Sequence, residues 1–184
     1  MKHLILILLI SCGFSTLVQS QEFTSLDKSP LDVAYLPDNF AHDRVDGEKA
    51  IAKVYYSRPA KNGRVVFGKM APYGKVWRLG ANEATELKTF QDLTLGDKKI
   101  KAGAYTMFAI PGEAEWTIIL NSQLDFWGVH AYQERNDVAR FTVPTKSLPE
   151  VVEAFSIRFE DLGNNAAVMR IAWDQTLVEI PVKY

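Results

Sequence analysis

From Ala50 onward the chain consists of short runs in which apolar and polar residues alternate, separated by Gly, Pro, Asn or Asp. The clearest run is Phe-Ser-Ile-Arg-Phe at residues 155–159. Residues two apart lie on the same face of a β-strand, so this run predicts a strand with one buried and one solvated face. Strands that recur about every ten residues, with almost no helical period, are typical of antiparallel sheets. The pattern predicts an all-β fold, an antiparallel β-sandwich in which barrel-like closure is also possible.

The expected strands are rich in β-branched and aromatic residues, which favour extended backbone. They cover 51–56, 85–90, 93–95, 105–110, 116–121, 128–132, 139–143, 155–159, 167–173 and 177–182. One or two helical turns are expected over 147–153 after a proline. Residues 174–176 are expected to form the turn of a hairpin between the last two strands.

The length of 184 residues favours one domain after any processing. Residues 50–184 contain the alternation and are expected to form a single β-sandwich domain. Residues 21–49 are rich in turn-forming residues, and they are expected to pack as an irregular N-terminal strap. The expected anchors of this strap are Val33, Tyr35 and Phe40.

Residues 1–20 have the features of a cleaved signal peptide. Residues 4–10 are wholly apolar, and Val18 and Ser20 occupy the positions before a cut where signal peptidase accepts small side chains. This apolar core is shorter than the roughly 20 residues that span a bilayer. Cleavage between Ser20 and Gln21 therefore predicts an exported protein, periplasmic or extracellular, with no transmembrane span after processing.

Cys12 supports a second interpretation of the N-terminus. Residues 9–13 resemble a bacterial lipoprotein box, in which the cysteine is lipidated and becomes the new N-terminus. If cleavage follows Ser20 instead, the mature chain has no cysteine, because Cys12 is the only one. Thiol catalysis and cysteine metal sites would then be excluded.

Charge and histidine spacing exclude several function classes. The formal net charge is −1, and there is no basic stripe, so nucleic-acid binding is not expected. The histidines, His3, His42 and His130, lack the spacing of zinc ligands. No Gly-x-Ser-x-Gly motif is present. We therefore assign no catalytic residue, no metal and no cofactor from the sequence.

Residues 72–85 hold an unusual density of aromatic and polar side chains between two expected strands. Trp77 offers a flat apolar ring, Arg78 a planar fork of donors, and Asn82 and Glu83 further hydrogen-bonding groups. This mixture suits a sugar or another small polar ligand. In the alternative interpretation the segment is an ordered crossover, with Trp77 buried, Arg78 paired with Glu83, and Asn82 capping a turn.

Other side chains could contribute to the same surface. Arg58 and Arg64 end neighbouring segments and could meet Arg78 at one rim as an anion site, although surface arginines are common. Residues 126–128 and Tyr132 could supply stacking platforms, although core packing is the commoner role of aromatic residues. The candidate ligand-binding residues are Arg58, Arg64, Tyr73, Trp77, Arg78, Asn82 and Glu83.

Several motifs carry a family resemblance. The most specific are Tyr-Gly-Lys-Val-Trp-Arg at 73–78 and Gly-Ala-Asn-Glu-Ala-Thr at 80–85, supported by Tyr-Ser-Arg-Pro at 56–59 and Ala-Trp-Asp at 172–174. Over residues 29–184 the chain resembles the bacterial family called domain of unknown function 2911. The resemblance implies an exported, mostly β protein from bacteria with a double-membrane envelope, and it implies no activity.

The leading hypothesis is a binding module for a small polar or carbohydrate ligand, or for an envelope partner. An alternative is a hydrolase that uses Glu83 as general acid or base, which would need a second carboxylate or a histidine in the same concave site. The other alternative is a structural component of the envelope.

Overall fold

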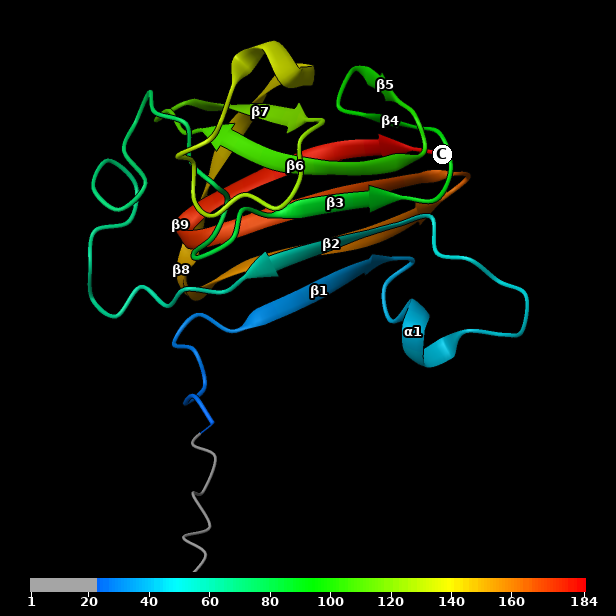
Figure 1. Cartoon of the computed structure of the whole chain (residues 1–184), viewed down its shortest axis with the longest axis horizontal. Coiled ribbons are helices and arrows are strands. Elements are labelled where there is room, and N and C mark those ends of the chain that lie inside the picture. Colours follow the sequence, from blue (N-terminus) through cyan, green and yellow to red (C-terminus); the bar gives the residue numbers. More distant parts are fainter. Residues whose placement is uncertain (1–22) are drawn as a thin grey trace, which may run out of the picture.

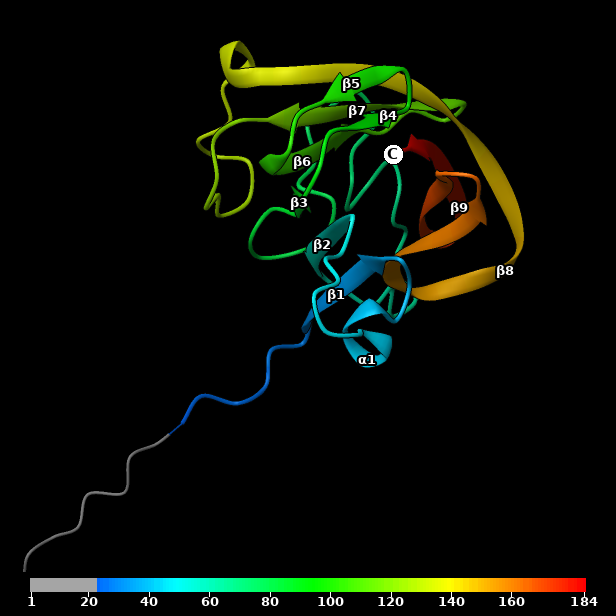
Figure 2. The ribbon, with the colours of Figure 1, turned by 90° about the vertical axis from the view of Figure 1, so that its right-hand side faces the viewer.

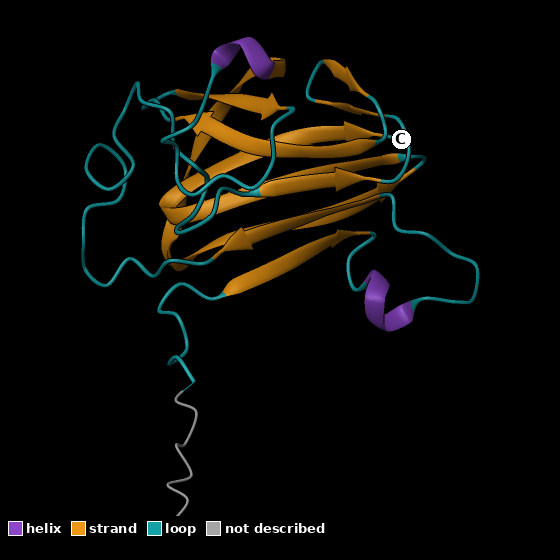
Figure 3. Cartoon of the chain, in the orientation of Figure 1, coloured by secondary structure: helices purple, strands orange, loops and turns teal. Residues whose placement is uncertain are grey.

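The computed structural model describes residues 23–184 and is almost entirely β (Figures 1 and 3). The predictions for residues 1–20, Cys12 and the cut after Ser20 lie outside the described residues. The elements are β1 (Leu31–Leu36), α1 (Phe40–Asp43), β2 (Ala52–Ser57), β3 (Glu86–Thr89), β4 (Leu93–Leu95), β5 (Lys98–Ile100), β6 (Gly103–Ile110), β7 (Glu115–Asn121), η1 (Glu134–Asn136), β8 (Asp137–Gly163) and β9 (Ala166–Lys183). No helix within residues 23–184 is long and apolar enough to cross a membrane.

All nine strands belong to one antiparallel sheet in the order β1-β2-β3-β6-β7-β8-β9-β4-β5. The long strand β8 pairs with β7 through its first part and with β9 through the remainder. Figure 2 shows β8 running across the top of the molecule and then bending round to the side where β9 lies. The two parts of the sheet therefore face each other as the layers of a sandwich, which confirms the predicted fold class.

The core fills the space between these layers. Residues that alternate along the central strands point inward, such as Met107 and Ala109 of β6 and Ile118 and Leu120 of β7. Aromatic rings form a cluster within this core, with neighbouring centroids 5.0–6.4 Å apart. These rings belong to Phe67, Trp77, Trp116, Phe155 and Trp173. Burial of large aromatic surfaces is the main stabilising contribution expected from this cluster.

The sheet does not close into a barrel, since β1 and β5 remain at opposite ends of the strand order. The second part of β8 nevertheless approaches β2 and the residues after it. The Tyr56 hydroxyl donates to the carbonyl of Ile157 at 3.0 Å, and Ala60 forms an isolated bridge with Ala154.

The second half of the chain differs from the sequence prediction in two places. Residues 147–153 form no helix, because they lie within β8. Residues 174–176 form no hairpin turn, because β9 runs through them. Asp174 takes a left-handed backbone conformation, with φ 53°, opposite Val152, where the register of β8 shifts. Both strands therefore bend together at this point.

Two further segments also differ from expectation. Residues 128–132 form no strand, and they belong to the loop that covers the outer face of β6 and β7 through Phe108, Ile119 and Phe126. The segment expected to be an irregular strap contains the edge strand β1. Its buried residues are Ala34 and Leu36, whereas Val33 lies on the opposite, exposed face.

Candidate functional site

The segment 72–85 is an ordered crossover beside β6. Trp77 exchanges two backbone hydrogen bonds with Ala109, at 2.7 and 2.9 Å, so it extends the sheet past the start of β3. The chain then reverses through Leu79 and Gly80, which have φ values of 54° and 147°. The Thr85 hydroxyl closes the loop by donating to the carbonyl of Leu79. These contacts explain why the segment is ordered.

Trp77 has a structural role. Its side chain is buried within the aromatic core, and its indole nitrogen donates to the carbonyl of Gly80 at 3.3 Å. The ring is therefore not available as a stacking surface, and the alternative interpretation of Trp77 as a buried residue is correct.

Arg78 is half-buried on the opposite side of the segment. Its Nε atom has no hydrogen-bond acceptor among the described residues. The guanidinium lies beside Gly128, where an added side-chain carbon would come within 3.9 Å of Nη1 and 3.7 Å of His130 Nε2. Burial lowers the pKa of Arg78, because the charged form loses hydration. No ion pair within residues 23–184 joins Arg78 to Glu83, so the expected pairing of these two side chains does not form.

Arg58 and Arg64 make local structural contacts. Arg58 donates to Asp32 at 2.9 Å, to the carbonyl of Phe155 at 3.2 Å and to Ser156 at 3.0 Å. Arg64 donates to two backbone carbonyls of the loop that precedes it, at 2.5 and 2.9 Å. Each guanidinium therefore has its own protein partners.

Tyr73 and Asn82 lie at the ends of the crossover. Tyr73 is 41% exposed, and its ring covers Gly68. Asn82 has a left-handed backbone with φ 57°, and its amide donates to Asp27 at 3.0 Å. Asn82 therefore orders the turn, as expected from its tolerance of this conformation.

Glu83 and Trp127 are brought together by a short antiparallel ladder. Ala84 donates to the carbonyl of Phe126, and Gly128 donates to that of Asn82, each at 3.0 Å. These bonds flank a bridge between Glu83 and Trp127, and directly opposed residues extend their side chains to the same side. Trp127 is 64% exposed, whereas the other tryptophans are buried.

Glu83 also lines a groove of about 380 Å³, which we call the Glu83 groove. Its lining residues are Leu31, Tyr55, Tyr56, Ser57, Glu83, Ala84, Glu86, Asp125 and Phe126. Glu86 accepts a hydrogen bond from the backbone of Asp125 at 3.1 Å. The groove contains three carboxylates, Glu83, Glu86 and Asp125. Within the described chain none of them forms an ion pair with a lysine or arginine.

Tyr55 and Glu86 are not among the site residues predicted from the sequence. They become neighbours because β2 and β3 pair with Tyr55 opposite Glu86. The register between the two strands, which the sequence pattern of either strand does not give, is what shows that they share a groove. In the part of the chain that the structure describes, no three His, Cys, Asp or Glu side chains are arranged to hold a metal.

The comparison with known families gives one match. The profile of a family described as "Protein of unknown function (DUF2911)" matches residues 37–182. This match confirms the resemblance predicted from the motifs. Neither the curated proteins nor the solved structures contain a match to this chain.

Proposed function

Since the chain belongs to the DUF2911 family, whose function is unknown, its activity must be argued from its own residues, and we propose that it is a binding module for a small carbohydrate. The ligand lies in the Glu83 groove and extends over Trp127. The observation that carries the proposal is that Trp127, 64% exposed, is bridged through its backbone to Glu83, which lines that groove.

The chemistry of the groove suits a polyol. A sugar ring has a face of C–H groups that packs on an aromatic ring and a rim of hydroxyls that donate to carboxylates. Trp127 supplies the ring, and Glu83 and Asp125 supply acceptors. A mostly apolar wall with a few placed polar groups is the usual composition of a small-molecule site.

The charge of the groove selects among sugars. Glu83, Glu86 and Asp125 have no cationic partner within residues 23–184, so they repel an acidic ligand and attract a basic one. The expected ligands are neutral sugars and amino sugars, and uronic acids are expected to be excluded.

The test is calorimetric titration with neutral, amino and uronic-acid oligosaccharides. Trp127→Ala and Glu83→Gln are expected to weaken binding at least about tenfold, the effect of roughly 1.4 kcal/mol. The matched controls are Tyr73→Ala and Glu113→Gln, an exposed aromatic and an exposed carboxylate that do not line the groove. Unchanged affinity in Trp127→Ala, or tightest binding of the uronic acids, would refute the proposal.

A hydrolase is the second candidate, because Glu83 lines one concave groove together with two further carboxylates, Glu86 and Asp125. Glycoside hydrolysis needs two carboxyl groups, one protonated and one ionised. Incubation with aryl glycosides distinguishes the candidates. A hydrolase releases the aryl group and loses this release in Glu83→Gln, whereas a binding module shows no turnover.

We also propose that the protein acts outside the cytoplasm, in the periplasm or the extracellular space. The support is the apolar run at 4–10 and the small residues before Gln21. Mass spectrometry of the mature N-terminus tests this. A chain that begins at Gln21 is expected, lipid on Cys12 would favour the lipoprotein alternative, and an intact Met1 would contradict export.

A further inference from the structure

A second pocket lies between α1 and the outer face of β1 to β3, on the side where α1 stands in Figure 1. We call it the Lys53 pocket, and its volume is about 480 Å³. Its lining residues are Tyr35, Phe40, Ala41, Arg44, Glu48, Lys49, Ala50, Lys53 and Phe90. None of them lines the Glu83 groove, so the inference drawn from this pocket is independent of the proposed function.

Three aromatic rings form the walls of the Lys53 pocket. Tyr35 and Phe40 pack with their ring centroids 6.2 Å apart. The ammonium group of Lys53 lies 5.8 Å from the centroids of both Tyr35 and Phe90, and 4.8 Å from that of Tyr55, which lies outside the pocket lining. The pocket therefore combines apolar ring surfaces with a positive charge placed at their edge.

Lysine and arginine side chains outnumber carboxylates in the lining of the Lys53 pocket. Lys53 is directly opposite Lys88 in the pairing of β2 with β3, and like charges at opposed positions destabilise a sheet. Lys88 also reaches Phe90, with its ammonium group 5.2 Å from the ring centroid. The two lysines are thus held over the same ring, and neither forms an ion pair within residues 23–184.

The loop after α1 adds further positive charge. Arg44 and Lys49 line the pocket, and neither forms an ion pair within residues 23–184. Glu48 is the one carboxylate in the lining, and it accepts a hydrogen bond from the backbone of Val45 at 3.1 Å. An anion bound among these cations would remove the repulsion between Lys53 and Lys88.

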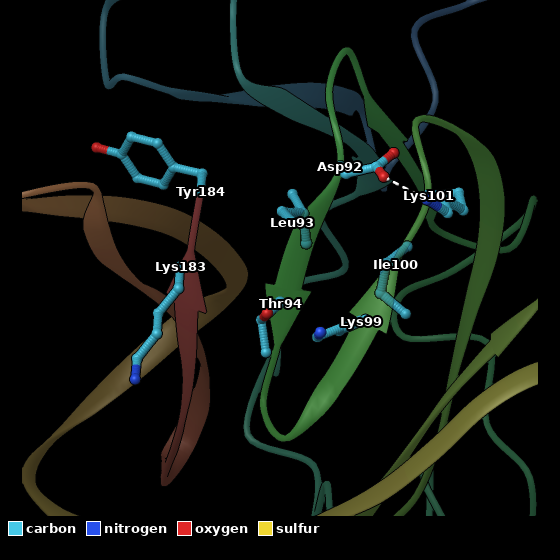
Figure 4. A pocket seen from close by; sticks show the side chains of 8 residues that line it. All are labelled: Asp92, Leu93, Thr94, Lys99, Ile100, Lys101, Lys183 and Tyr184. Carbon is cyan, nitrogen blue, oxygen red and sulfur yellow. Dashed lines mark hydrogen bonds and ion pairs between the residues drawn. The ribbon is translucent and has the colours of Figure 1, made fainter.

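A second pocket lined by lysines differs from the Lys53 pocket in its ion pairing and in its aromatic content. Figure 4 shows Lys99 on β5 and Lys183 on β9, on either side of β4. There Lys101 already pairs with Asp92 at 2.7 Å, and Tyr184 is the one aromatic residue in the lining. Lys99 and Lys183 therefore provide matched controls of equal charge.

We propose that the Lys53 pocket binds a small molecule that carries a phosphate or carboxylate group on an aromatic or apolar body. The anionic group lies between Lys53 and Arg44 of the lining, on the side of Lys88, which stands over Phe90 outside the lining. The body packs on Tyr35, Phe40 and Phe90. Arg44 can meet such an oxyanion with two parallel hydrogen bonds. The apolar body distinguishes the ligand from a free inorganic anion, which would gain nothing from the rings.

The test measures binding of phenyl phosphate and inorganic phosphate to the purified protein by calorimetry. Phenyl phosphate is expected to bind at least about tenfold more tightly than inorganic phosphate. Lys53→Gln and Lys88→Gln are each expected to weaken phenyl phosphate at least about tenfold, while Lys99→Gln leaves it unchanged. In the absence of ligand, Lys88→Gln is expected to raise the melting temperature, because it removes the like-charge pair.

Three results would overturn the proposal. The first is no binding of phenyl phosphate to a wild-type protein that melts cooperatively. The second is equal weakening by Lys53→Gln and Lys99→Gln, which would indicate attraction by net charge alone. The third is binding to phosphatidylglycerol vesicles without binding to phenyl phosphate, which would make this face a membrane contact. Lys88 is exposed, so Lys88→Gln keeps the test informative if Lys53→Gln fails to fold.

Discussion

At the scale of single residues, the reversal at Leu79 and Gly80 depends on the absence of a side chain at residue 80. An added Cβ there would lie 2.8 Å from the carbonyl oxygen of Ser57, which is backbone and cannot move aside. Gly63 also has a positive φ, of 69°, but nothing lies within 4 Å of its added Cβ. Gly63 therefore shows the cost of alanine in the left-handed region without a close contact.

We therefore expect Gly80→Ala to lower the free energy of unfolding by about 1–3 kcal/mol more than Gly63→Ala. Both substitutions place alanine at a positive φ, but φ 147° at Gly80 is less tolerated by alanine than φ 69° at Gly63, so the difference combines backbone strain with the contact with Ser57. Urea denaturation followed by fluorescence gives both values. Equal costs would show that the crossover shifts to accept the methyl group.

The arginines allow a second comparison at this scale. Arg58 donates to three partners, whereas the Nε atom of Arg78 is buried without an acceptor among the described residues. We expect Arg58→Met to destabilise the protein by about 1–3 kcal/mol, because the carbonyl of Phe155 loses the Arg58 donor and Asp32 loses its ion pair.

Arg78→Met is expected to leave the free energy of unfolding unchanged or to raise it by about 1 kcal/mol, since it removes an incompletely satisfied charge. Thermal melting of both variants is the measurement. A large loss of stability in Arg78→Met would mean that its guanidinium contributes to folding.

The sequence predicted the chemical character of the candidate residues, but it did not predict which other side chains they lie beside. It identified Glu83 as an acceptor and residues 126–128 as aromatic, and the structure places Glu83 opposite Trp127. It could not distinguish the buried Trp77 from the exposed Trp127, because each follows an apolar residue, Val76 or Phe126, and they differ only in which layer covers them.

At the scale of elements, alternation predicted β2, β3, β4, β6 and β7 to within two residues at each end. The prediction from alternation was wrong where a strand bends. Asp174, in the segment predicted to be a turn, takes a left-handed conformation, yet β9 continues because β8 shifts its register at the facing position. A compensating irregularity in a partner strand cannot be read from either strand alone.

The bend leads to a prediction about ion pairs. Lys61 contacts Asp174 at 2.5 Å, with both side chains only 20–21% exposed. The pair of Lys98 with Asp97 is much more exposed, at 43% and 68%. We expect Asp174→Asn, which keeps the tolerance of a positive φ, to cost about 1–2 kcal/mol.

Asp97→Asn provides the matched control and is expected to cost less than about 0.5 kcal/mol, since exposed ion pairs contribute little. Chemical denaturation at low and high salt measures both effects. If the two variants lose the same stability, the contact of Lys61 with Asp174 does not stabilise the bend.

At the scale of the whole molecule, the two parts of the sheet are joined by side chains as well as by β8. Tyr56 of β2 donates to the carbonyl of Ile157 in β8, and Arg58 donates to that of Phe155. These bonds cross the open side of the sandwich, where β2 and β8 do not pair as strands. The packing of the layers should therefore be sensitive to the ionisation of Tyr56.

Burial raises the pKa of Tyr56, and the nearby Asp32 carboxylate acts in the same direction. The folded state thus favours the neutral phenol. The stability that this preference contributes is fully present below the unfolded pKa, about 10 for tyrosine, and it is lost as the pH rises through the higher folded value. We expect the free energy of unfolding to fall from about pH 10 upward.

Tyr56→Phe is expected to be less stable than the wild type at pH 7 by about 1 kcal/mol, because the carbonyl of Ile157 loses its donor. Its stability should then decline less steeply above about pH 10, so that the two curves converge. Tyr132→Phe and Tyr184→Phe are the controls, since burial also raises the pKa of both phenols and neither hydroxyl bonds to the backbone of β8. Parallel curves for the wild type and Tyr56→Phe would contradict this account, because the loss at high pH would then arise from other groups.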